Sequence, residues 1–214
     1  MTEENQIVPN DTQNNNLKSF IFNNKKSVIS FFIIIFLSLF SYFFYSDYKK
    51  NIKSQISEKY NLAINNYDKS NPQSSIEKMN NIINKKDSTY SPLALYFLLD
   101  NNLLTDKNKI NKYFDILIYE VDLDDEIKNL IIYKKGLFNS DTASEEELLE
   151  IFKPLINNEN LWKSHALYVM AEYFFSKNEK QKSKEFFEKI LEMNNPNPQI
   201  RLETQKRLQR DFSV

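Results

Sequence analysis

The amino-acid sequence predicts an all-α protein in which one N-terminal transmembrane helix is followed by an array of helical hairpins. Three observations support this fold class. An apolar run without a charge extends from Val28 to Tyr45. In the rest of the chain, apolar residues recur at the helical spacing i, i+3, i+4, i+7, and no segment alternates as a strand does. The single glycine, Gly136, leaves no series of tight glycine turns to join the strands of a sheet.

The apolar run is long enough to cross a bilayer. Its 18 residues cover roughly 27 Å at the helical rise of about 1.5 Å per residue. Lysines flank both ends, and tyrosines lie where an interfacial aromatic belt is expected. These flanking residues are Lys25, Lys26, Tyr42, Tyr45, Tyr48, Lys49 and Lys50. Membrane attachment is therefore expected through Val28–Tyr45.

Two other interpretations of the apolar run fit its sequence less well. A buried core helix is usually shorter and carries a polar face. A cleaved signal peptide has a shorter apolar region and a site of small residues after it, whereas Ser41 is followed by Tyr, Phe, Phe and Tyr. We therefore expect residues 25–47 to form an uncleaved transmembrane signal anchor.

The charges around the anchor do not decide its orientation, because Lys18, Lys25 and Lys26 are matched by Lys49, Lys50 and Lys53. The short tail with its lysine pair resembles the n-region of a signal anchor, which predicts a cytoplasmic N-terminus and an exported C-terminal domain. Residues 1–24 are rich in Asn, Gln, Thr and Glu and are predicted to be a disordered polar tail.

Residues 48–214 are predicted to form one helical domain. The clearest apolar stripe is Ile110, Tyr113, Phe114, Leu117, Ile118 and Val121. Further stripes are Ile127, Leu130, Ile131, Leu137 and Phe138; Leu148, Leu149, Phe152, Leu155 and Ile156; and Phe186, Phe187, Ile190 and Leu191. A fifth stripe, from Ile52 to Tyr67, is expected to continue the membrane helix outward. The total is about nine helices of roughly 12 to 20 residues.

Helix ends have recognisable signals. Three capping side chains precede a proline at the first helical position, in Asn71-Pro72, Ser91-Pro92 and Asn197-Pro198. Ser144 and Glu147 have the spacing of a capping box. Pro154 falls inside an apolar stripe, so a kink or an early helix end is expected there.

One stretch matches the tetratricopeptide repeat, which has a period of about 34 residues and two helices per repeat. The matching positions are Leu167, Met170, Ala171 and Phe174 in the first helix, Ser183, Phe187, Ile190 and Leu191 in the second, and Pro196 after it. Asn178 stands where the turn glycine usually lies. Any pair of amphipathic helices would give some of these matches. The stretch nevertheless favours a superhelical array of helical hairpins that is tetratricopeptide-like (TPR-like).

The layout of residues 17–210 resembles the TPR-like domain of the ancillary subunit of the bacterial Sec translocon (SecYEG). The most specific part is Leu161-Trp162-Lys163-Ser164-His165-Ala166-Leu167, and Tyr60, Ala63, Pro198, Arg201 and Arg207-Leu208 also fit. The chain departs from that family at Asn178 and Ser183, where glycine and alanine are usual. The resemblance implies an inner-membrane protein with a periplasmic domain, associated with the translocon, exported polypeptides and periplasmic chaperones, and without catalytic activity.

The candidate protein-binding face is carried by the first helix of the matching repeat. On a TPR template its inner face presents His165, Tyr168, Glu172 and Phe175. Exposed aromatic side chains are common anchors for peptides. The alternative for His165 is capping or packing, and Trp162 is expected in the core rather than at the site.

Composition excludes several other functions. The 28 basic and 29 acidic residues give a net charge of −1, so no field attracts nucleic acid. With no cysteine and one histidine, the chain offers no thiolate or paired-histidine metal site, and one glycine cannot build a phosphate-binding loop. We expect no cofactor and no small-molecule substrate. The acidic runs Glu145–Glu147 and Asp122–Glu126 are interpreted as favoured first helical turns.

Three functional hypotheses follow. The first is a non-enzymatic, membrane-anchored protein-interaction scaffold, an ancillary factor of the Sec translocon and the periplasmic chaperone network. The second is an envelope assembly or cell-division scaffold with the same fold. The third, an envelope hydrolase, rests only on the presence of carboxylate pairs, so enzyme activity is not expected.

Overall fold

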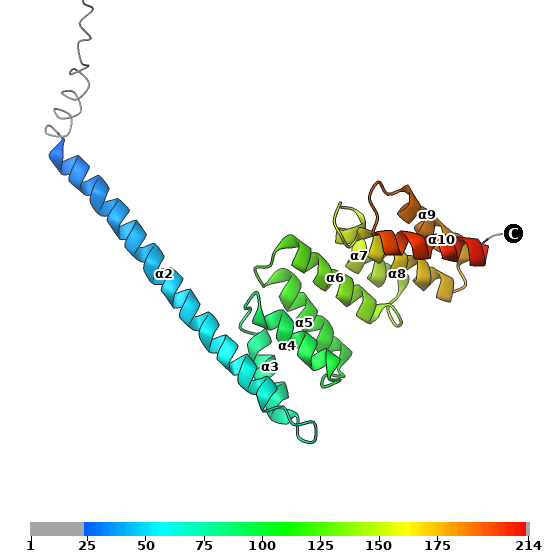
Figure 1. The fold of residues 1–214 in the computed structure, drawn as a ribbon, viewed down its shortest axis with the longest axis horizontal. Coiled ribbons are helices and arrows are strands. Elements are labelled where there is room, and N and C mark those ends of the chain that lie inside the picture. Colours follow the sequence, from blue (N-terminus) through cyan, green and yellow to red (C-terminus); the bar gives the residue numbers. More distant parts are fainter. Residues whose placement is uncertain (1–23, 213–214) are drawn as a thin grey trace, which may run out of the picture. The chain divides into compact units, whose positions relative to one another are not determined.

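The computed structural model describes residues 24–212, and the predicted polar tail 1–24 lies outside them except for Asn24. Within the described residues every regular element is a helix, which confirms the all-α prediction (Figure 1). The helices are α2 (Lys25–Asn65), α3 (Gln73–Ile83), α4 (Tyr90–Asp100), α5 (Lys107–Tyr119), α6 (Asp125–Asn139), α7 (Glu145–Ile156), α8 (Lys163–Ser176), α9 (Lys180–Glu192) and α10 (Pro198–Phe212).

The first helix, α2, has 41 residues and is long and apolar enough to cross a membrane. The described side chains of its apolar stretch are exposed, as for Phe36 and Phe44. The prediction that the membrane helix continues outward is confirmed, since α2 runs without a break to Asn65. The chain divides into two compact units, residues 1–55 and 56–214, and the last turns of α2 belong to the second.

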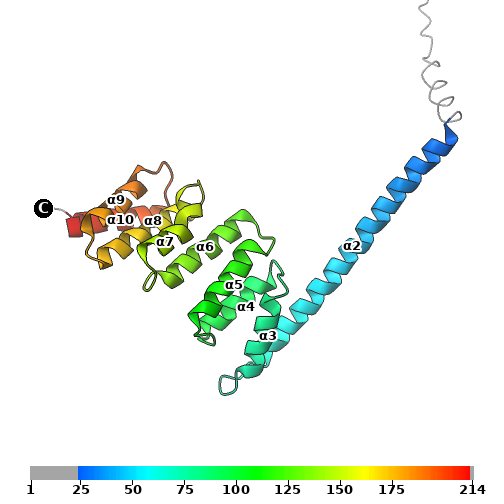
Figure 2. The same ribbon diagram turned by 180° about the vertical axis from the view of Figure 1, so that it is seen from behind.

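In the second unit, each helix packs against the next one along the chain (Figures 1 and 2). The α8–α9 and α3–α4 hairpins have the most extensive interfaces. Helices two apart also touch, namely α3 with α5, α6 with α8, and α8 with α10. Helical hairpins packed in series are therefore the architecture of this unit.

A single large apolar cluster runs through most of these hairpins, and a smaller one lies between α8, α9 and α10. All six residues of the stripe predicted from Ile110 to Val121 are buried, as the helical spacing requires. The largest fully buried side chains include Phe114, Phe152, Phe174, Phe187, Met79, Leu95, Leu98 and Leu148. The helices thus gain stability mainly from packing one apolar side against their neighbours.

Two of the predicted helix starts are confirmed. At the start of α7, the Ser144 hydroxyl accepts a hydrogen bond from the Glu147 N–H at 3.2 Å, and the Glu147 carboxylate accepts one from the Ser144 N–H at 2.8 Å. This is the capping box. At the start of α10, the Asn197 side chain accepts from the Gln199 N–H at 3.0 Å. Both caps are made within four residues, which is why sequence spacing identifies them.

The other two predicted caps are wrong. Helix α4 begins at Tyr90, and the Asp87 carboxylate accepts a hydrogen bond from the Tyr90 N–H at 2.8 Å. Ser91 is fully buried and donates to the Ile82 carbonyl oxygen at 3.0 Å, so it joins α4 to α3. At α3 the residue at the N-cap is Pro72, and no side chain caps the helix. A kink or an early end is predicted at Pro154, but α7 includes Pro154 and continues to Ile156, the last residue of the predicted apolar stripe.

The turn between α8 and α9 contains a residue in the left-handed conformation. Asn178, which stands at the usual turn glycine, has φ of 62°. Since the left-handed region costs an ordinary side chain roughly 1–2 kcal/mol, we expect Asn178→Ala to lower the free energy of unfolding by about 1 kcal/mol. Asn178→Gly should change it by less than about 0.5 kcal/mol, because relief of strain offsets the greater backbone entropy of glycine.

Denaturant unfolding followed through the fluorescence of Trp162, the single tryptophan, measures both changes. An equal loss of unfolding free energy in the alanine and glycine variants would contradict this explanation of the turn.

Candidate protein-binding face

Three aromatic side chains from α6 and the start of α8 form a cluster. The rings of Tyr133 and Trp162 are stacked, with centroids 5.2 Å apart. The His165 ring packs edge-on against Tyr133 at 5.6 Å and lies 5.2 Å from Trp162. Trp162, expected in the core, is half-buried and packs on the edge of the main cluster. This places His165 at the junction between α6 and α8.

The cluster is electrically neutral around pH 7. Burial lowers the pKa of His165, and the Leu161 carbonyl partly opposes this effect. Burial also raises the pKa of Tyr133. A lowered imidazole pKa and a raised phenol pKa both favour the uncharged forms. No hydrogen bond of normal geometry reaches the buried Nδ1 atom of His165 from the described residues. The cluster therefore suits apolar contacts better than ionic ones.

Beside this cluster, α6 presents apolar side chains to solvent. Ile127 is 43% exposed and Leu137 is 49% exposed, while Leu130 and Tyr133 are partly buried between them. These four residues lie within one side of the helix by their spacing. The α6–α8 face, as used below, consists of Ile127, Leu130, Tyr133, Leu137, Trp162 and His165.

The exposure of this face corrects the single buried stripe predicted for residues 127–138. Ile131 is fully buried as expected, but Ile127 and Leu137 are not. Helix α6 carries apolar residues on two sides, and Ile131 and Ile132 on one of them are buried, whereas Ile127 and Leu137 on the other remain exposed. An apolar helix side left in solvent is a common feature of protein-interaction sites.

The other three predicted site residues lie in contact with α9 and α10. The Tyr168 ring packs edge-on against Phe187 at 5.5 Å. The Glu172 carboxylate binds the Arg207 guanidinium through two hydrogen bonds of 2.6 and 2.7 Å. Phe175 packs against Phe212 with centroids 5.9 Å apart, and the Arg207 guanidinium lies 4.4 Å from the Phe175 ring centre.

The four predicted residues therefore fall into two groups. His165 belongs to the α6–α8 face, whereas Tyr168 packs on α9, and Glu172 and Phe175 contact α10. Sequence reasoning did not identify the exposed α6 residues Ile127 and Leu137. The available signal was the width of the apolar pattern on residues 127–138, which is too broad for one buried helix side.

The Arg207 contacts hold α10 to α8. We expect Arg207→Met to lower the free energy of unfolding by about 1 kcal/mol. The variant loses the ion pair with Glu172, which solvent partly screens, and the cation–π contact with Phe175. Amide hydrogen exchange in α10 should accelerate roughly fivefold, while exchange in α6 and α7 stays unchanged. Lys206→Met, which removes only the surface pair with Glu203, is the control. Unchanged exchange in α10 would show that its apolar residues alone hold the helix.

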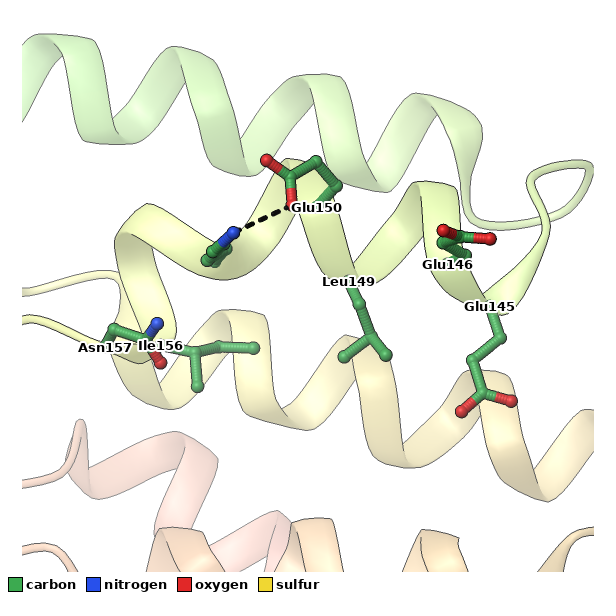
Figure 3. Close-up of a pocket in the computed structure, with 7 residues that line it drawn as sticks. Glu145, Glu146, Leu149, Glu150, Ile156 and Asn157 are labelled. Atoms are coloured by element: carbon green, nitrogen blue, oxygen red, sulfur yellow. Dashed lines mark hydrogen bonds and ion pairs between the residues drawn. The ribbon is translucent and has the colours of Figure 1, made fainter.

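A hollow of about 510 Å³ lies along α7 (Figure 3). Its lining includes Glu145, Glu146 and Glu150 together with Leu149 and Ile156. Glu145 pairs with Lys182 at 2.9 Å, and Glu150 pairs with Lys153 at 3.2 Å. Within residues 24–212 no three metal-ligating side chains gather at one point. Glu145 and Glu150 thus serve as ion-pair partners, and the acidic first turn Glu145–Glu147 complements the N-terminus of α7.

The described part of the chain is thus a helical-hairpin unit preceded by a helix capable of crossing a membrane. No protein-family model, no curated protein and no solved structure matches this chain.

Proposed function

We propose that this protein is a membrane-anchored protein-interaction scaffold, an ancillary factor of the Sec translocon and the periplasmic chaperone network. The proposal combines an anchor through Val28–Tyr45 with a binding surface on the helical hairpins. Its localisation is the inner membrane, single-pass, with a cytoplasmic N-terminus and a periplasmic C-terminal domain. The family resemblance of Trp162–Leu167 supports the translocon as the partner.

The observation that carries the proposal is the exposed apolar and aromatic surface of the α6–α8 face. Leu137 at 49% exposure and Ile127 at 43% border the aromatic cluster around Tyr133. Aromatic and apolar side chains of this kind anchor peptide segments by removing apolar area from water. Attachment to the membrane raises the effective concentration of the domain near a membrane-bound partner, so weak contacts suffice.

A TPR-like arrangement of the hairpins is part of the proposal. It is supported by contacts between alternate helices, α6 with α8 and α8 with α10, which bring the first helices of successive hairpins side by side. It is also supported by the small residues Ala171 and Ser183, which are fully buried where α8 and α9 approach each other. In such an array the α6–α8 face lies on the inner side, where ligands usually bind.

Protease treatment of intact spheroplasts tests the proposed side of the membrane. Digestion of the domain after Tyr48 supports the periplasmic location. Protection until the cells are lysed would contradict it and would indicate a cytosolic adaptor.

Site-specific photo-cross-linking tests the binding surface. A photo-reactive residue replaces Leu137 in the full-length protein in cells, and the same residue at Leu202 of α10, which is 46% exposed, is the matched control. We expect translocon subunits or exported polypeptides to be cross-linked from position 137 and not from 202. Equal cross-linking from both positions would contradict the proposal.

A loss-of-function strain separates the two scaffold hypotheses. Slowed protein export with normal cell shape supports the translocon-associated scaffold. Altered shape with normal export would favour the envelope assembly or cell-division scaffold.

A further inference from the structure

Helix α10 fills a site on α8 and α9 that recognises an arginine. This α8–α9 site consists of Glu172, Phe175 and Phe187. The Glu172 carboxylate accepts two hydrogen bonds from the Arg207 guanidinium, at 2.6 and 2.7 Å. The same guanidinium lies 4.4 Å from the ring centre of Phe175 and 5.8 Å from that of Phe187. A carboxylate along the edge of the guanidinium and aromatic rings against its face form a contact that a lysine ammonium does not reproduce.

The α8–α9 site also holds an aromatic ring of α10. The Phe212 ring packs edge-on against Phe175 at 5.9 Å and against Phe187 at 6.0 Å between centroids. Phe212 follows Arg207 by five residues in the same helix, which is roughly 7.5 Å along the axis. The occupied site thus shows which chemistry it binds, namely a helix with an arginine and an aromatic residue five positions later.

The attachment of α10 is shallow. Of the described residues of α10, only Thr204 is fully buried, and its hydroxyl donates to the Ile200 carbonyl oxygen of its own helix. Ile200, Leu208 and Phe212 are partly buried against the smaller apolar cluster. Among the described helices, α10 contacts α8 and α9 only. A helix held on one side by partly buried side chains opens locally more readily than the helices beneath it.

The α8–α9 site and the α6–α8 face share helix α8. His165 of the face precedes Glu172 by seven residues in α8, which is roughly 10 Å along the axis. Among the contacts between described helices, none joins α10 to α6. A partner segment that binds the α8–α9 site and the α6–α8 face together therefore gains contacts that α10 does not make. This difference in binding free energy favours replacement of α10 by the partner.

We propose that α10 is an autoinhibitory helix that occupies the α8–α9 site until a partner helix displaces it. The partner helix carries an arginine, which binds Glu172 and stacks on Phe175, and an aromatic residue five positions later, which takes the place of Phe212. This inference rests on the proposed scaffold function and names the chemistry of its partner. It also explains why Glu172 and Phe175, which have the spacing of a ligand face, are covered in the free protein.

The test uses the isotopically labelled full-length protein in phosphatidylcholine nanodiscs and a fluorescein-labelled peptide with the sequence of residues 197–212. The double variant Arg207→Met, Phe212→Ala keeps the α8–α9 site and weakens its own occupant. In fluorescence anisotropy this variant should bind the peptide about tenfold more tightly than the unmodified protein does, because bound α10 lowers the apparent affinity by the fraction of molecules that are open.

Two changes test the chemistry of the site. A peptide with lysine in place of the arginine at position 207 should bind the double variant about fivefold more weakly or worse. Glu172→Gln, added to the double variant, should weaken binding of the original peptide by about tenfold. Glu185→Gln on α9 makes the same change in charge at an exposed position and should leave the affinity unchanged.

Hydrogen exchange of the unmodified protein tests the displacement itself. A saturating amount of peptide should accelerate exchange in α10, whose isotope label separates it from the peptide, and should leave exchange in α5 unchanged. Without peptide, α10 should exchange faster than α9.

Three results would overturn the proposal. One is absence of peptide binding by a double variant whose exchange in α5–α7 equals that of the unmodified protein. Another is equal affinity for the arginine and the lysine peptides. The third is exchange in α10 that is no faster than in α9 and is unaffected by the peptide, which would make α10 a permanent part of the packing. Peptide binding without cross-linking from position 137 would support the autoinhibitory helix and contradict the proposed function, so the two failures are distinguishable.

Discussion

Phe152→Ala is expected to lower the free energy of unfolding of the helical domain by about 3–5 kcal/mol. The Phe152 ring is fully buried in the main apolar cluster, where α7 packs against α6. Its removal leaves a cavity between these helices in addition to the lost apolar transfer energy. Since the Phe152 ring lies beside the Tyr133 ring, with centroids 6.5 Å apart, the same variant should also loosen the Tyr133–Trp162 contact.

Thermal unfolding of the full-length protein in nanodiscs, followed through Trp162 fluorescence, measures the effect. For a domain of this size a loss of this magnitude lowers the midpoint by roughly 10 °C. Lys153→Ala, at the exposed neighbouring position, is the control and should shift the midpoint by less than about 1 °C. A similar midpoint for both variants would show that α7 is not part of the cooperative core.

Gly136→Leu is expected to destabilise the domain nearly as much, lowering its free energy of unfolding by about 3 kcal/mol. A Cβ atom at Gly136 would lie 2.2 Å and 2.3 Å from two ring atoms of Phe152. Both distances are far below van der Waals contact, so the larger side chain must push α6 and α7 apart. On an exposed helix the same substitution would stabilise by about 1 kcal/mol, because glycine is a poor helix former. The sign of the effect therefore reports the close approach of the two helices.

A double-mutant cycle tests that interpretation. In the Phe152→Leu background the ring is absent, so Gly136→Leu should cost at least 1 kcal/mol less than it does in the unmodified protein. Urea unfolding of the four proteins gives the coupling energy. Additive losses would contradict a direct contact between Gly136 and Phe152.

Sequence patterns predicted local features well. The stripe from Ile110 to Val121 is buried throughout, and the Ser144 capping box forms with both hydrogen bonds. The turn residue Asn178 adopts the left-handed conformation expected of the glycine it replaces. Each of these depends on residues within one or two helical turns of each other, so the spacing along the chain contains the necessary information.

Other features depended on which helices meet. Ser91 had the sequence position of a helix cap, but its buried hydroxyl donates a hydrogen bond to a carbonyl of α3. The side chain that accepts a hydrogen bond at the start of α4 is Asp87. Tyr168, Glu172 and Phe175 had the spacing of an open ligand face, yet α10 contacts Glu172 and Phe175 through Arg207 and Phe212. Spacing along one helix does not specify which distant segment packs on it.

The sequence by itself determined the all-helical class, the apolar segment long enough to span a membrane, and the caps at Ser144 and Asn197, because these follow from local spacing and composition. The tertiary structure decided which apolar residues remain exposed, Ile127 and Leu137 among them. It also explains why residue 136 is glycine, because the ring of Phe152 packs directly against α6 at this position. Whether a side chain is buried depends on which other helix packs against it, and the apolar pattern of one helix does not specify that neighbour.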